Sequence, residues 1–119
     1  MFLPSKFALV AAIAIAWNPT APVGIPHGFL TGNDYLQEPD TQRQGYVEGL
    51  VDGLFMSPAF GADEAVVLRF KACTQPMKSP QIKAIFEKYL RDNPQIWHDD
   101  AQVLFWQAMI QACPGLMPR

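Results

Sequence analysis

Two cysteines, Cys73 and Cys113, are the residues of this chain with the widest choice of chemistry. A cysteine can act as a nucleophile when a basic neighbour lowers the pKa of its thiol. Two cysteines can also be oxidised to a structural disulfide. Lys71 is the only charged residue within three positions of either cysteine, so the sequence offers little to activate a catalytic thiol.

Two further groups of polar residues could carry chemistry, and each has a simpler structural explanation. The His-Asp-Asp run at residues 98–100 resembles half of a metal site, but a stable site needs three or four ligands and the other histidine, His27, is remote in sequence. Glu48 and Asp52 could form an acid–base pair, yet no recognisable nucleophile or oxyanion donor accompanies them. We therefore predict a helix start at residues 98–100, a solvated helix face at Glu48 and Asp52, and no catalytic residue, metal or cofactor.

The start of the chain has the layout of a secretory signal peptide. Lys6 precedes an apolar run that ends in the small residues Ala14 and Ala16. The run is shorter than the ~20 apolar residues that a membrane-spanning helix needs. We expect a periplasmic protein that is cleaved near Ala16 and has no stable membrane anchor. Because exported proteins meet an oxidising compartment, this favours a Cys73–Cys113 disulfide.

Size and charge narrow the classes of partner. The chain has 119 residues, with 9 Lys+Arg and 11 Asp+Glu, which is room for one domain. It has no basic run to bind nucleic acid and no Lys/Arg-rich amphipathic face to bind anionic lipid. We expect a protein partner, with a homodimer left open.

Hydrophobic periodicity predicts an all-α fold, a small bundle of about four to five helices clamped by one disulfide. A short helix begins near residue 31, and longer ones cover about 41–55, 79–93 and 98–112. The predicted organisation is a signal peptide at 1–16, a flexible proline-rich lead-in at 17–29, a helical domain at 30–115 and a tail at 116–119.

The same patterns predict how these helices pack. Gly45, Gly49 and Gly53 recur every four residues, and each costs ~1 kcal/mol of helix propensity relative to Ala. We expect another helix to pack closely on this stripe, unless the helix is simply weak. The last helix is apolar nearly all round and is therefore predicted to be central and buried. Lys83 and Glu87 are assigned to the solvated face of the 79–93 helix.

Two segments are predicted to protrude. Residues 57–72 contain turn-forming residues and are expected to form an excursion with a short helix, held at its end by Cys73. This segment carries Phe60 and the acidic pair Asp63 and Glu64, which could meet a basic rim on a partner. The turn at 93–99 carries Trp97, a residue type enriched at binding hot spots, although core packing is the commoner role. We favour the first segment as the partner-binding site.

Several strings of the sequence also resemble a known family, the Rap/Tai-type immunity proteins. They cover about residues 29–115: G-N-D-Y-L (32–36), G-Y-V-E-G-L-V-D (45–52), Cys73, Q-I-K-A-I-F-E-K-Y-L-R-D-N-P (81–94), H-D-D-A-Q-V-L (98–104) and Q-A-C-P (111–114). The resemblance implies a small periplasmic all-helical protein that neutralises a peptidoglycan amidase toxin of a type VI secretion system. Members often carry a further cysteine near the first helix. This chain has no cysteine there, and the corresponding position is Gln37 or a residue next to it.

A different class of function stays open, that of a small periplasmic acid-stress chaperone. Such proteins are also helical with one disulfide, but they usually have a highly charged, lysine-rich surface. This chain is 17% charged and has few lysines, which argues against that class. An accessory binding domain without activity of its own is the third alternative.

Overall fold

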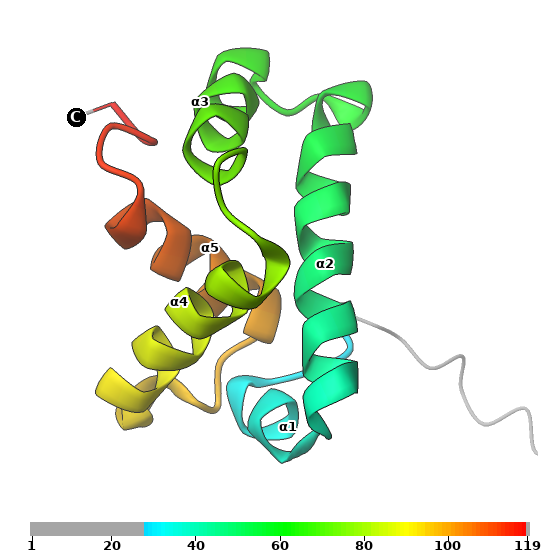
Figure 1. Cartoon of the computed structure of the whole chain (residues 1–119), viewed down its shortest axis with the longest axis vertical. Coiled ribbons are helices and arrows are strands. Elements are labelled where there is room, and N and C mark those ends of the chain that lie inside the picture. The colour runs from blue at the N-terminus through cyan, green and yellow to red at the C-terminus, as the bar shows by residue number, and fades with distance from the viewer. Residues whose placement is uncertain (1–27, 119) are drawn as a thin grey trace, which may run out of the picture.

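A computed structural model describes residues 28–118, and these residues form α-helices joined by short turns (Figure 1). The α-helices are α1 (Gly32–Gln37), α2 (Asp40–Met56), α3 (Glu64–Thr74), α4 (Ser79–Asp92) and α5 (Ala101–Ala112); the 3-10 turns are η1 (Ser57–Phe60) and η2 (Pro94–Ile96). The predicted all-α class is confirmed, since this range contains no β-strand. None of the helices in it is long and apolar enough to span a bilayer. The predicted signal peptide and most of the predicted lead-in lie outside the described residues.

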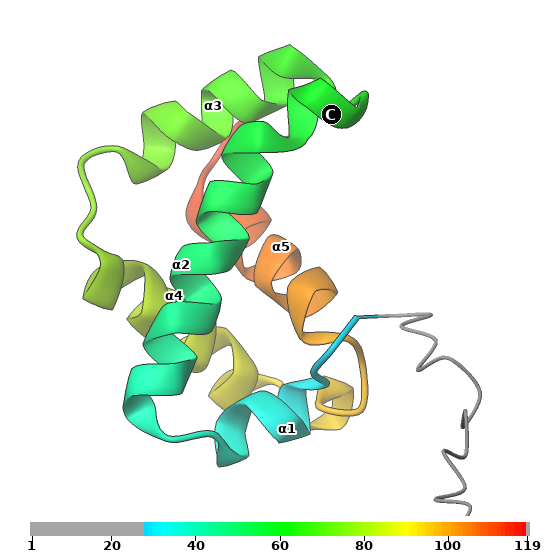
Figure 2. The same cartoon turned by 90° about the vertical axis from the view of Figure 1, so that its right-hand side faces the viewer.

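Helix α2 runs along the molecule and connects its two ends. In two perpendicular views, α1 lies at one end of α2 and α3 at the other, with α4 and α5 between them (Figures 1 and 2). Helix α4 packs against both α2 and α5. The aromatic centre of the core joins three helices, because the Phe86 ring lies 4.7 Å from that of Tyr35 and 5.4 Å from that of Phe105.

The starts of three helices differ in how their free amides are capped. Thr31 caps α1, and its amide and hydroxyl donate to the Asp34 carboxylate, which lowers the pKa of that carboxyl. In α4 the cap position is held by Lys78, whose side chain makes no capping hydrogen bond. The Ser79 hydroxyl instead donates to Glu48 on α2. Helix α2 also begins without a side-chain cap.

The predicted disulfide is present and ties α3 to the segment after α5. Cys73 and Cys113 are bonded, with their Cα atoms 5.9 Å apart. The chain then continues into the core, because Leu116 is 2% exposed and its carbonyl accepts a hydrogen bond from Arg69 Nε at 3.0 Å. The packed domain therefore includes Leu116, which the sequence analysis placed in the tail.

One predicted packing arrangement is wrong, and a second holds only in part. A Cβ added to Gly45, Gly49 or Gly53 would meet nothing within 4 Å, so no described helix packs on the glycine stripe. Helix α5 is buried on one side, but Val103 and Ile110 on its other side are 44% and 37% exposed. An apolar composition identified α5 as a core helix without showing that its outer face stays uncovered.

Candidate functional site

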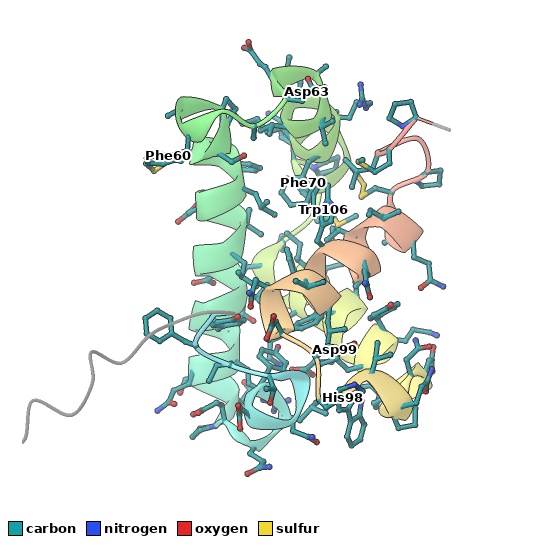
Figure 3. The ribbon with its side chains drawn as sticks, turned by 180° about the vertical axis from the view of Figure 1, so that it is seen from behind. Phe60, Asp63, Phe70, His98, Asp99 and Trp106 are labelled. Atoms are coloured by element: carbon teal, nitrogen blue, oxygen red, sulfur yellow. A yellow bond between two sulfur atoms is a disulfide. The ribbon has the colours of Figure 1, made fainter. Side chains whose placement is uncertain are left out.

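The residues predicted to bind a partner lie on two separate surfaces. Phe60, Asp63 and Glu64 lie where α2 gives way to α3. Trp97 lies beside α1, because the Trp97 carbonyl accepts a hydrogen bond from the Asn33 amide at 2.8 Å. Figure 3 shows these regions at opposite ends of the molecule, with Phe60 and Asp63 at one end and His98 and Asp99 near the other.

The segment predicted as an excursion with a short helix is mostly helical. It consists of η1 and the eleven-residue helix α3, which buries Val67 and Phe70 in the body of the molecule. The helix was expected to be short, because proline, glycine and aspartate precede it closely and its buried positions are few. What protrudes is the short junction between α2 and α3, rather than a long loop.

Local hydrogen bonds fix the conformation of this junction. The Ser57 hydroxyl donates to the Leu54 carbonyl at 2.6 Å, which closes the end of α2. Gly61 then adopts a φ of 98°, a left-handed conformation that glycine takes without strain. Asp63 caps α3 by accepting a hydrogen bond from the Ala65 amide at 2.9 Å. The residues between the two helices are therefore held in one arrangement.

Large apolar side chains are exposed at this end of the molecule. Phe60 is 81% exposed, Met56 60% and Met117 46%. Met117 also lines a hollow of about 260 Å³, together with Leu54, Ser57, Ala62, Asp63, Val66, Val67, Phe70 and Trp106. Large exposed apolar side chains near an apolar hollow make this end a candidate protein-binding surface. We call Met56, Phe60, Asp63, Glu64 and Met117 the junction surface.

The junction surface is also acidic. Asp63 and Glu64 are exposed at the start of α3, where the positive end of the helix dipole favours negative charge. Within the part of the chain that the structure describes, neither carboxylate forms an ion pair with Lys or Arg. Both charges are therefore available to a basic partner.

Trp97 has a structural role in the turn between α4 and α5. Its indole is half-buried, and its Nε1 donates to the Leu90 carbonyl at 2.6 Å. Its backbone packs against Gly32, where an added Cβ would lie 3.1 Å from the Trp97 Cα atom. The side chain thus anchors the turn to α4 with its hydrogen-bond donor occupied, and the backbone of Trp97 holds the turn against α1.

The remaining candidate residues do not come together as a catalytic or metal site. His98 Nε2 lies 3.3 Å from Asp99 Oδ1, and both residues are exposed. Among residues 28–118 no group of three His, Cys, Asp or Glu residues could hold a metal ion. Glu48 and Asp52 are exposed on α2, as predicted.

A buried polar cluster was missed by the sequence analysis. Glu87 is buried, and its Oε1 accepts hydrogen bonds from the Tyr35 hydroxyl at 3.1 Å and from the Arg43 guanidinium at 2.8 Å. Lys83 Nζ lies 3.3 Å from Glu87 and 2.7 Å from Asp40. Burial and the negative charge of Glu87 raise the pKa of the Tyr35 hydroxyl, which stays protonated and donates. The predicted solvated face is therefore wrong at these two positions of α4.

Comparison with known proteins gives one match. A family model described as Rap1a immunity proteins matches residues 31–115. No curated protein and no solved structure matches the chain. The matched range runs from the cap of α1 to the residues after Cys113, so it includes the disulfide and the α2–α3 junction.

Proposed function

The chain belongs to the Rap1a immunity protein family, and on that premise we propose that it is a periplasmic immunity protein that binds and inhibits a peptidoglycan amidase toxin of a type VI secretion system. Membership of the family supports protection against a toxin. The resemblance to Rap/Tai-type proteins supports an amidase as that toxin. The leader with Lys6 supports export, followed by cleavage near Ala16.

The observation that carries the proposed binding site is the exposure of Phe60 on a conformationally fixed junction. An inhibitor loses less affinity to ordering when its contact segment is already held in place. Aromatic side chains that enter a partner's pocket contribute much of the energy of protein interfaces. In the proposed mode, Phe60 enters the substrate cleft of the amidase while Asp63 and Glu64 face basic residues at its rim. The protein acts by occlusion and carries out no reaction itself.

The test is co-expression of the full chain with a candidate amidase toxin directed to the periplasm, scored as rescue from lysis. The wild-type chain is expected to rescue, and Phe60→Asp to rescue poorly, because a charge replaces the apolar contact. Trp97→Phe keeps an aromatic side chain in the turn and loses only the hydrogen bond to Leu90; it is the matched control and is expected to rescue fully.

Three outcomes would change the proposal. Rescue by Phe60→Asp together with loss of rescue in Trp97→Phe would move the site to the turn at residues 93–99. A wild-type chain that accumulates folded in the periplasm and still fails to rescue would overturn the amidase assignment. If that chain also prevented protein aggregation at low pH, the acid-stress chaperone would become the better explanation.

A further inference from the structure

A groove along the side of α2 is distinct from the junction surface. It has a volume of about 350 Å³ and lies between α2 and the residues that connect α3 to α4. Apolar side chains line most of it, namely Val47, Val51, Phe55, Met77 and Ile82. Glu48 and Asp52 also line it and are both exposed. The groove is thus apolar inside with carboxylates at its edge.

The charge at this edge is uncompensated within the described structure. Glu48 accepts hydrogen bonds from the Ser79 hydroxyl and the Gln44 amide, which are neutral donors. No lysine or arginine lines the groove, and among residues 28–118 neither Glu48 nor Asp52 has a basic ion-pair partner. Lys71 lies over the Phe55 ring, with Nζ 5.2 Å from the ring centre, and does not pair with either carboxylate. The edge therefore favours a cationic occupant.

The glycine stripe makes the neighbouring surface of α2 unusually easy to approach. At 100° per residue, Gly45 and Gly49 follow Asp52 around the helix on the side away from the core. Open space surrounds the position of an added Cβ at both glycines. A partner backbone can therefore come closer to α2 here than it could over ordinary side chains.

We infer that this groove binds a segment of the partner protein that combines apolar side chains with two basic ones. The apolar side chains occupy the groove, and the Lys or Arg residues face Glu48 and Asp52. These carboxylates lie one turn apart, about 6 Å along α2, which matches basic residues four apart on a helix or two apart on a strand. The inference rests on the proposed function in taking the toxin as the partner.

Charge complementarity decides between this occupant and a second copy of the chain. The chain has a formal net charge of −2, and its junction surface is also acidic. Placing two such chains together at this groove would bring like charges into proximity, which weakens association. A basic segment of a different protein fits the edge better.

The first experiment tests the chemistry of the groove without the toxin. A fluorescent amphipathic peptide of Leu and Lys is titrated with the oxidised protein, and a Leu–Glu peptide serves as the probe control. Glu48→Gln/Asp52→Asn is expected to weaken binding of the Leu–Lys peptide roughly tenfold, the effect of losing two exposed ion pairs. Asp92→Asn/Asp99→Asn, which removes the same charge from exposed positions outside both surfaces, is expected to leave the affinity unchanged. Equal binding by the two double variants, or no binding by the wild-type protein, would overturn the inference.

The second experiment uses the catalytically inactivated toxin and separates the two proposals. If the wild-type chain binds the toxin and Glu48→Gln/Asp52→Asn binds it equally well, the groove inference is wrong and the immunity function stands. If the wild-type chain does not bind the toxin but the Leu–Lys peptide behaves as expected, the proposed function is wrong and the groove remains a site for basic segments.

Discussion

Glu87 shows how a charged side chain can become part of a small core. Removing a carboxylate from water is costly unless hydrogen bonds and opposite charges replace the lost hydration. Here Tyr35, Arg43 and Lys83 supply those contacts from three helices. The residue lies on a polar stripe of α4, so helical periodicity assigns it to solvent. Its burial depends on how α1 and α2 fold over α4, which no local pattern encodes.

We predict that Glu87→Ala lowers the free energy of unfolding by about 3 kcal/mol, because it leaves partly buried cations without their acceptor. Lys88→Ala on the same helix is the control, since the Lys88–Asp92 pair is exposed and is expected to contribute less than about 1 kcal/mol. Urea denaturation measures both variants. Equal urea midpoints for the two variants would show that Glu87 is solvated. The polar cluster around Glu87 would then not hold the helices together.

The pH dependence of stability provides a second test at this scale. The hydrogen bond and charge of Lys83 hold the pKa of the Asp40 carboxyl below its usual range. A carboxyl whose pKa is lower in the folded state stabilises the protein above its unfolded pKa of about 4, and this contribution is lost as the pH falls through the folded value. We predict that Asp40→Asn lowers the melting temperature near neutral pH, and that the difference from wild type disappears in strong acid. A difference in melting temperature that stays constant from neutral pH to strong acid would contradict the Asp40–Lys83 ion pair.

At the scale of helices, periodicity located α2, α4 and α5 but did not show what covers their outer faces. The spacing of apolar residues fixes which face is buried, whereas the opposite surface depends on the tertiary arrangement. The glycine stripe of α2 illustrates the difference, because the expected close helix contact is absent at Gly49 and occurs at Gly32 instead. Gly32 gave no periodic signal, since it lies at the start of a helix of six residues.

We predict opposite effects of the same substitution at these two glycines. Gly49→Ala should stabilise the protein by about 0.5–1 kcal/mol, because it improves helix propensity in open space. Gly32→Ala should destabilise it by about 1–3 kcal/mol, because the new Cβ would press against the backbone of Trp97. Thermal melts of the two variants provide the measurement. Destabilisation by Gly49→Ala would show that something packs on the stripe after all.

The disulfide is the element-scale feature that the sequence predicted best, because a chain with two cysteines has one possible internal pairing. It connects positions 40 residues apart and holds α3 beside the end of α5. Cys73→Ser/Cys113→Ser is therefore expected to lower the free energy of unfolding by about 2–5 kcal/mol. Reduction of the wild-type protein should lower its stability by a similar amount and leave the double variant unaffected. Identical unfolding curves with and without reductant would refute this role.

At the scale of the whole molecule, the sequence predicted the fold class and the candidate residues but not their arrangement. Phe60 and the Trp97 turn both qualified as protrusions, and the structure places them at opposite ends. The first end combines exposed apolar side chains with two carboxylates, Asp63 and Glu64, that have no basic partner in residues 28–118. Helix α2 links this end to the groove at Glu48 and Asp52, so one partner could contact both surfaces.

The central claim is that this protein inhibits a cell-wall amidase by covering its active site with the junction surface. The most direct measurement is the rate of peptidoglycan hydrolysis by a purified candidate amidase, titrated with the oxidised protein. The rate is predicted to fall to zero near one equivalent for wild type, and to need a large excess of Phe60→Asp for the same effect. An undiminished rate in the presence of excess folded wild-type protein would contradict the claim.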